Sequence, residues 1–318
     1  MTKLEHIILT SPPFAFIRNK SRKIIIPGFE GLPLYDVFRF FLQQIKKIGL
    51  NERAAAISFN FIMAIPAATL FLCTLIPYLP ISKQFFSELI RIVNDITPNK
   101  ETQRLIRDFL DDFFNKPKSG LLSIGFVLAL FYSSNAMIGI IRAFDRSIDD
   151  KKRSNFIYKR LRAIRLTLIV ILLLIGTILI SLGQGVLFST VMKWVHINNV
   201  HAKWWIRTLR WLVIVVLFLY SIAFIYKYAP SVKKRWKLIS PGALFATFLM
   251  VFTTALFSYW AQNFSNYNKF YGSIGTLLIL MLLIFVNSLM LLIGYELNVS
   301  ITYLKKLAEQ RAEKEKEV

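Results

Sequence analysis

The chain has 318 residues, 55% of them hydrophobic, and its 40 Lys and Arg against 18 Asp and Glu give a formal net charge of +22. This composition is too apolar for an ordinary soluble domain, and because the basic residues lie mostly between long apolar blocks it disfavours a nucleic-acid-binding protein. The lone cysteine, Cys73, excludes an intramolecular disulfide and a metal cluster of the cysteine type.

Residues 1–53 are predicted to form a cytoplasmic lead. The apolar run Ile24–Ile26 ends at Pro27, so we expect no cleaved signal peptide. From Leu34 to Ile48, apolar residues recur at helical spacing with basic residues between them. This pattern predicts an amphipathic helix, which lies either along the membrane surface or on the cytoplasmic face of the protein itself.

The region 54–303 is predicted to be an all-α, polytopic membrane domain. A transmembrane helix needs about 20 predominantly apolar residues, and six segments satisfy this requirement. Lys and Arg are abundant in the N-terminal region, after the second and fourth segments and in the C-terminal tail, which favours cytoplasmic N- and C-termini. The predicted spans are 54–79, 120–142, 166–192, 206–228, 241–262 and 274–303.

Two connections outside these spans have their own patterns. The loop 80–118 carries nearly balanced charges and two amphipathic stretches on either side of Pro98, so we expect an extracytoplasmic helical hairpin. The charged tail, 304–318, is predicted to be a short helical extension in the cytoplasm.

Three local features suggest how the spans pack. Pro66, near the middle of the first span, should kink or break the helix, either beside a cavity or only to improve packing. Small residues from Gly125 to Ala143 follow one stripe of the second span and predict a close helix–helix seam, within the protein or between subunits. Ser240 and Pro241 are typical of an N-cap and a first helical residue.

Several segments between residues 50 and 300 resemble the YihY/BrkB family of bacterial inner-membrane proteins, which has also carried a ribonuclease label. The matching segments are Arg53-Ala-Ala-Ala-Ile-Ser-Phe59 with Pro66, Gly120-Leu-Leu-Ser-Ile-Gly125 with Ala136 to Asp145, Lys159-Arg-Leu161, Tyr228-Ala-Pro230, Ser240-Pro-Gly-Ala243, Tyr259, Tyr271-Gly-Ser-Ile-Gly275 and Gly294-Tyr-Glu-Leu-Asn298. The chain departs from the family at Phe59-Asn60-Phe61, where tyrosines are expected, and at Asp145, where asparagine is expected. The resemblance implies a six-helix membrane protein without a settled activity, most often discussed as a transporter.

Glu296 is the only carboxylate within the apolar segments. A carboxylate at membrane depth is costly and indicates a functional site whose partner must be found. Counting along the predicted helices places it at the depth of Asn60 and Asn135, above the cytoplasmic ends of their spans. We expect Glu296 to face the bundle interior and to meet Arg142, Arg53 or water.

Two interpretations of this group remain open. In one, the polar residues line a cytoplasm-facing cavity that accepts a substrate or couples its movement to protons through Glu296. In the other, Glu296 belongs to a structural ion pair that fixes helix register. The candidate cavity residues are Arg53, Asn60, Pro66, Ser133, Asn135, Arg142, Asp145, Asn287, Glu296 and Asn298. The candidate helix-packing or hinge residues are Pro241, Gly242, Tyr271, Gly272, Gly275 and Gly294.

The sequence disfavours an enzyme. Its acidic residues are dispersed over loops, its three histidines (His6, His196 and His201) lie in connections, and it has no phosphate-binding loop, so we predict no catalytic residues, metal or cofactor. The first functional hypothesis is a transporter or exporter of a lipid-like or other amphiphilic substrate. The alternative is a membrane scaffold that docks an envelope protein through residues 80–118.

The expected surroundings follow from these hypotheses. We expect a multi-pass protein of the bacterial cytoplasmic membrane, in contact with the phospholipid bilayer and its anionic headgroups. A homo-oligomer or an envelope protein partner fits the sequence, and nucleic acid is not expected as a partner.

Overall fold

The computed structural model describes residues 28–75, 90, 100–115, 119–148, 155–182, 200–232, 236–263 and 267–316. Within these ranges the chain forms helices and no strand, which confirms the predicted all-α class. The helices are α3 (Leu34–Lys47), α4 (Leu50–Leu75), α6 (Lys100–Asn115), α7 (Ser119–Asp145), α8 (Phe156–Leu182), α10 (Val200–Tyr228), α11 (Pro241–Asn263) and α12 (Tyr267–Lys316).

Five of the described helices are long and apolar enough to cross a membrane, so the chain is a multi-pass membrane protein. Large apolar side chains such as Val127 and Phe248 are exposed on these helices, where acyl chains would contact them. The candidate spans are Leu50–Phe71, Gly120–Asp145, Trp211–Tyr228, Pro241–Trp260 and Leu277–Glu315. The predicted span 166–192 overlaps α8, which is not among the five, and its part beyond Leu182 lies outside the described residues.

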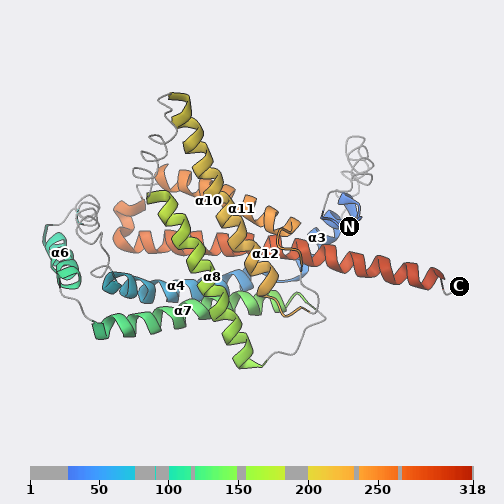
Figure 1. The fold of residues 1–318 in the computed structure, drawn as a ribbon, viewed down its shortest axis with the longest axis horizontal. Coiled ribbons are helices and arrows are strands. Elements are labelled where there is room, and N and C mark those ends of the chain that lie inside the picture. Colours follow the sequence, from blue (N-terminus) through green and yellow to red (C-terminus); the bar gives the residue numbers. More distant parts are fainter. Residues whose placement is uncertain are drawn as a thin grey trace.

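The bundle is built around α4, α7 and α12 (Figure 1). Helices α4 and α7 pack along each other, α12 packs on α4, and α11 packs on α12. Helices α8 and α10 contact each other and run obliquely to α4 and α7 (Figure 1). Helix α6 lies at one end of the bundle, whereas α3 and the C-terminal part of α12 lie at the other (Figure 1).

Small residues let α4 and α7 approach each other as an antiparallel pair. A Cβ added to Gly125 would lie 3.3 Å from the Cα of Phe71, and one added to Gly139 would lie 3.1 Å from the Nδ2 of Asn60. Lipid tails are as apolar as the side chains, so helices in a membrane associate largely through such close packing. The small-residue stripe of α7 therefore faces α4.

The crossing of α11 and α12 requires two glycines. A Cβ on Gly242 would lie 2.2 Å from the carbonyl oxygen of Gly294, and a Cβ on Gly294 would lie 2.5 Å from the Cβ of Ala246. The first turn of α11 is further tied to α12 because Gly242 N–H donates to Asn298 Oδ1 at 2.8 Å. Asn298 Nδ2 donates to Ser240 Oγ at 2.8 Å, and that oxygen accepts the N–H of Ala243 at 3.3 Å, as an N-cap does.

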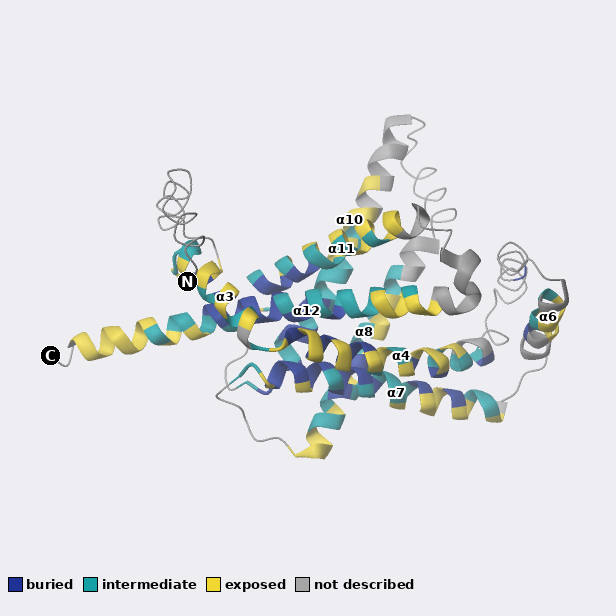
Figure 2. Cartoon of the chain, turned by 180° about the vertical axis from the view of Figure 1, so that it is seen from behind, coloured by how far each residue is buried: buried dark blue, intermediate teal, exposed yellow. Residues whose placement is uncertain are grey.

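Buried residues gather in the half of the bundle nearest α3 (Figure 2). An aromatic cluster lies at this core: the rings of Phe144 and Tyr295 stack with centroids 3.7 Å apart, and Tyr226 packs edge-on against both. The hydroxyl of Tyr226 donates to the carbonyl oxygen of Leu291 at 2.5 Å. The cluster joins α7, α10 and α12 beside Glu296, the residue that follows Tyr295.

Helix α3 has two apolar stripes with different surroundings. Val37 and Phe41 are buried against Leu297 and Ile301 of α12, whereas Phe38 remains exposed. One stripe of the helix thus packs on the protein, as one interpretation of the sequence expects. The other stripe stays uncovered, as a helix that lies along the membrane surface would need.

Two helices are more continuous than their sequences suggest. Helix α4 is not broken at Pro66, which lies inside it and is exposed. Helix α12 extends unbroken from Tyr267 to Lys316 and so includes the predicted sixth span and most of the charged tail. Of the predicted hairpin 80–118, α6 is described, and its first predicted helix, apart from Ile90, lies outside the described residues.

Candidate functional site

Glu296 lies completely buried on α12 and meets two of its neighbours through one oxygen. Its Oε1 is 3.4 Å from Nη1 of Arg53, a residue of α4 that is 8% exposed. The same oxygen accepts a hydrogen bond from Ser147, just after α7. Arg53 Nη1 also donates to Ser147 Oγ at 2.6 Å and to the Ala143 carbonyl oxygen at 3.3 Å. Arg53, Arg142 and water were the predicted partners of Glu296, and the structure brings Arg53 to it.

This ion pair compensates both buried charges, because an unpaired charge in a low-dielectric interior is strongly unfavourable. Hydrogen bonding around the pair is incomplete among the described residues: Oε2 of Glu296 and the hydroxyl of Tyr295 have no hydrogen-bond partner there. The arrangement ties α4, the end of α7 and α12 together.

Asp145 forms a separate polar contact. Its carboxylate accepts the backbone N–H of Ser231 at 2.9 Å and the hydroxyl of Ser231 at 3.1 Å, and it lies 3.7 Å from Lys159 Nζ. Arg162 donates to Ser231 Oγ at 3.0 Å and to the Ala229 carbonyl oxygen at 3.3 Å. Asp145 therefore holds the end of α7 to the start of α8 and to the turn after α10.

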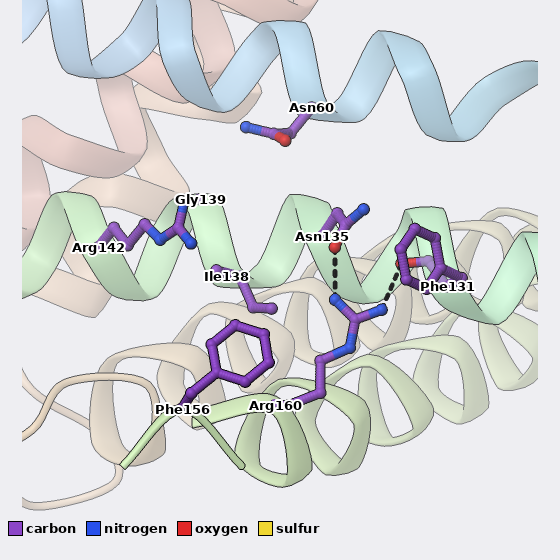
Figure 3. Close-up of a pocket in the computed structure, with 8 residues that line it drawn as sticks. All are labelled: Asn60, Phe131, Asn135, Ile138, Gly139, Arg142, Phe156 and Arg160. Carbon is purple, nitrogen blue, oxygen red and sulfur yellow. Dashed lines mark hydrogen bonds between the residues drawn. The ribbon is translucent and has the colours of Figure 1, made fainter. Parts of the chain in front are cut away.

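Asn60, Asn135 and Arg142 line an open pocket of about 420 Å³ between α4, α7 and α8 (Figure 3). The other described residues of its wall are Phe131, Ile138, Gly139, Phe156 and Arg160.

The guanidinium of Arg160 is held on the α7 side of this pocket (Figure 3). It donates to Asn135 Oδ1 and, at 3.4 Å, to the carbonyl oxygen of Phe131. It also lies over the ring of Phe131, 4.4 Å from the centroid, where the ring's negative face attracts a cation.

The predicted cavity residues therefore do not share one cavity in the described structure. Three line the pocket, Arg53 and Glu296 form the ion pair, and Asp145 and Asn298 form the contacts given above. Asn287 links α11 and α12 by accepting a hydrogen bond from Thr254 Oγ1 at 3.2 Å. Pro66 is exposed and Ser133 half-buried.

The predicted packing residues are placed in part. Gly242 and Gly294 meet at the crossing, and Pro241 begins α11. Tyr271, Gly272 and Gly275 belong to the backbone of α12, and their side-chain surroundings lie outside the described residues.

Arg160, Phe156 and Ser147 were missed as candidate site residues. The predicted spans leave Arg160 in the connection after the second span, because the third is predicted to begin at residue 166, whereas α8 begins at Phe156. The signal that could have found it is the segment Lys159-Arg160-Leu161, which is part of the family resemblance. Among the described residues, no group of three or more His, Cys, Asp or Glu side chains is placed to hold a metal ion.

Comparison with known proteins gives relatives along most of the chain. The chain is 26% identical over 260 residues to the putative ribonuclease-like protein YfkH of Bacillus subtilis, covering 82% of this chain and 93% of that protein. It is 24% identical over 275 residues to the UPF0761 membrane protein MS0032 of Mannheimia succiniciproducens, covering 83% and 88%. It is 20% identical over 272 residues to the UPF0761 membrane protein NTHI0384 of Haemophilus influenzae, covering 85% and 96%.

No solved structure gives a significant match to the chain. The family model described as virulence factor BrkB matches residues 41–318, which confirms the resemblance found in the sequence. The chain therefore belongs to the BrkB family of membrane proteins.

Proposed function

We propose that this protein is a transporter or exporter in the bacterial cytoplasmic membrane for a lipid-like or other amphiphilic substrate. The observation that carries the proposal is the pocket between α4, α7 and α8, which joins polar and aromatic side chains within a bundle of membrane helices. A site for an amphiphile needs polar groups for the head beside an apolar surface for the chain, and this pocket offers both.

The apolar surface continues outwards from the pocket. Phe156 is 72% exposed and Phe131 is 50% exposed, and Ile157 and Leu161 on α8 are exposed as well. In a bilayer these side chains would contact lipid tails. A substrate with its head in the pocket could thus keep its chain in the hydrocarbon while it moves.

The proposed topology has six spans, with α8 as the third, and both termini in the cytoplasm. The distribution of Lys and Arg along the sequence supports it. The position of α6 at the end of the bundle opposite α3 fits one crossing by α4 between them (Figure 1).

The proposal is tested by reconstituting the purified protein in liposomes and following labelled phospholipid between leaflets. Asn135→Ala removes a wall residue of the pocket, and Asn287→Ala is the matched control because Asn287 bonds Thr254 away from the wall. We expect movement that Asn135→Ala reduces and Asn287→Ala preserves. Movement no faster than in empty vesicles would contradict lipid transport by this protein.

A docking role is favoured by one observation on α6. Leu105 is 71% exposed at the end of the bundle, and the other exposed residues described on α6 are charged: Arg104, Arg107, Asp108 and Asp111. If the protein is a scaffold for an envelope protein, Leu105→Glu should abolish its cellular role. The same substitution should leave transport in liposomes unchanged, which separates the two functions.

We further propose that the protein is not an enzyme, although its relative from Bacillus subtilis is named ribonuclease-like. Among the described residues, the two buried carboxylates are engaged structurally, Glu296 with Arg53 and Asp145 with Ser231 and Lys159. A nuclease site needs either paired carboxylates that hold metal ions or a His/Lys acid–base pair in an accessible pocket. Purified protein should leave labelled RNA intact, and cleavage that Asp145→Asn abolishes would contradict this assignment.

A further inference from the structure

The described wall of the pocket between α4, α7 and α8 contains two arginines, two asparagines and no carboxylate. A charge within the membrane-spanning part of a protein normally meets a partner, because leaving it unpaired there is costly. The described part of the wall thus presents positive charge without a counter-charge of its own, and this imbalance points to an anionic ligand.

Neighbouring cations show what an internally compensated charge looks like in this fold. Arg53 contacts Glu296, and Lys159, one residue before Arg160, lies 3.7 Å from Asp145. In the described part of the chain, by contrast, Arg160 bonds only to neutral acceptors, and no hydrogen bond or ion pair is found for Arg142.

Arg160 is held in place without being neutralised. Asn135 Oδ1 and the Phe131 carbonyl oxygen each accept one N–H, and the Phe131 ring supports the face of the guanidinium. A guanidinium has more N–H donors than these two bonds use, and its planar fork matches two oxygens of a phosphate. Its remaining donors are available to a ligand.

The other polar groups lie where they can complete such a site. Arg142 is exposed at the wall on α7, and Asn60 faces it from α4 (Figure 3). Asn60 Nδ2 donates one proton to the Ala56 carbonyl oxygen at 2.7 Å and retains a second. Gly139 leaves space for the Asn60 side chain at the wall, since a Cβ on Gly139 would lie 3.1 Å from Asn60 Nδ2.

We propose that this pocket binds the phosphate group of an anionic ligand, with Arg160 and Arg142 as its cationic contacts and Asn60 as a further donor. The proposal rests on the transport function above and narrows its substrate class to phosphate-bearing amphiphiles. The volume of about 420 Å³ is within the range of small-molecule sites and leaves room for a headgroup. Phe156 and Ile138 would then contact the apolar part next to it.

The test measures binding by the full-length protein in non-ionic detergent, through the rise in thermal unfolding midpoint as a probe is added. The probes are inorganic phosphate, a short-chain phosphatidic acid and a short-chain phosphatidylcholine. Arg160→Gln and Arg142→Gln remove the proposed contacts. Arg165→Gln is the matched control, because Arg165 is exposed on the same helix and is not part of the wall.

We expect phosphatidic acid to bind and Arg160→Gln to weaken it about 10- to 100-fold, the usual effect of losing charge-assisted hydrogen bonds. Arg142→Gln should weaken it less, and Arg165→Gln should leave it unchanged. Asn135→Asp gives a second test, because it keeps an acceptor for Arg160 but places a carboxylate beside it. This variant should remain folded and lose anion binding.

The probes distinguish the source of the phosphate. Tight binding of phosphatidic acid with weak binding of inorganic phosphate supports a lipid headgroup. Equal binding of phosphatidic acid and inorganic phosphate supports an anion site but shows that its ligand need not be a lipid. Two outcomes would overturn the proposal. In the first, no probe binds. In the second, phosphatidylcholine binds as well as phosphatidic acid, and Arg160→Gln and Asn135→Asp bind the probes as well as Arg165→Gln does.

Failure of the site and failure of the transport function give different results. Arginine-dependent binding without lipid movement in liposomes would leave the site standing and overturn the transport function. Lipid movement that is insensitive to Arg160→Gln and Asn135→Asp would leave the transport function standing and overturn the phosphate site.

Discussion

At the scale of single residues, the ion pair of Arg53 and Glu296 is a buried contact between charged side chains of two helices. It joins α4 to α12 where both side chains are almost completely buried, and Ser147 bridges the two groups. Removing one member of a buried pair leaves the other charge uncompensated, whereas replacing both with apolar residues leaves no buried charge. The geometry thus favours a structural role in helix register over a mobile proton carrier.

The first prediction follows from this asymmetry. Arg53→Met alone and Glu296→Met alone should each destabilise the protein by about 3–5 kcal/mol, and the double variant should cost clearly less than their sum. Thermal or denaturant unfolding in detergent measures the coupling.

Glu296→Gln separates the structural role from proton coupling. If the variant folds as stably as the native chain but loses only transport driven by a pH gradient, then Glu296 acts in coupling and its structural assignment is wrong.

The second prediction concerns Asp145, where the resemblance to the family leads us to expect asparagine. An amide oxygen at this position could still accept the N–H of Ser231. Asp145→Asn should therefore change stability by less than about 1 kcal/mol, whereas Asp145→Ala leaves buried donors unmet and should cost about 1–3 kcal/mol. Unfolding midpoints of the two variants measured side by side test this, and equal losses would show that the charge opposite Lys159 matters more than the hydrogen bonds.

The depth of these residues could be predicted from the sequence, but their pairing could not. Counting residues from a helix end gives depth, so Arg53 and Arg142 both emerged as partners for Glu296. Each residue also turns the helix by about 100°, and the direction a side chain faces depends on how neighbouring helices pack. The structure turns Arg53 towards Glu296 and Arg142 towards the pocket.

At the scale of elements, two close helix contacts in the described structure, α4 with α7 and α11 with α12, involve glycines that the sequence could flag. Small residues at helical spacing indicated a seam on the second span, and Gly242 and Gly294 were expected to serve packing. The start of α8 could not be placed, because the basic run from Lys159 to Arg165 resembles a loop in composition. It becomes helical because it packs on α7 and because Arg160 and Arg162 find acceptors there and in the turn after α10.

The third prediction tests the crossing of α11 and α12. Gly242→Ala and Gly294→Ala should each prevent stable folding, because the new Cβ would lie 2.2 Å from the Gly294 carbonyl oxygen or 2.5 Å from the Ala246 Cβ. Gly176→Ala on α8 is the matched control: a Cβ there meets nothing within 4 Å, and alanine is the better helix former. The yield of monodisperse protein in detergent should fall for the first two variants and hold for the third. Normal yields of Gly242→Ala would show that the two helices can move apart at little cost.

At the scale of the whole molecule, the sequence predicted the fold class well because a membrane leaves few choices. Backbone groups in hydrocarbon must bond within their own segment, so long apolar stretches become helices whatever their neighbours do. The number of spans is harder to obtain, since it depends on where each stretch ends. The described helices include five that could cross a membrane, and α8 decides whether a sixth joins them.

The fourth prediction follows from the parity of this number. An even number of crossings places both ends of the chain on the same side, and five would place them on opposite sides. In a chain with Cys73→Ala, single cysteines replace three exposed residues: Gln43 on α3, Arg104 on α6 and Gln310 on α12. With six spans and cytoplasmic termini, a membrane-impermeant thiol reagent should label Arg104→Cys in intact spheroplasts. It should label Gln43→Cys and Gln310→Cys only after permeabilisation. Labelling of Gln310→Cys but not Gln43→Cys in intact spheroplasts would mean that α8 does not cross. The pocket between α4, α7 and α8 would then open to the membrane surface rather than along a path through the bilayer, and the case for transport would weaken with it.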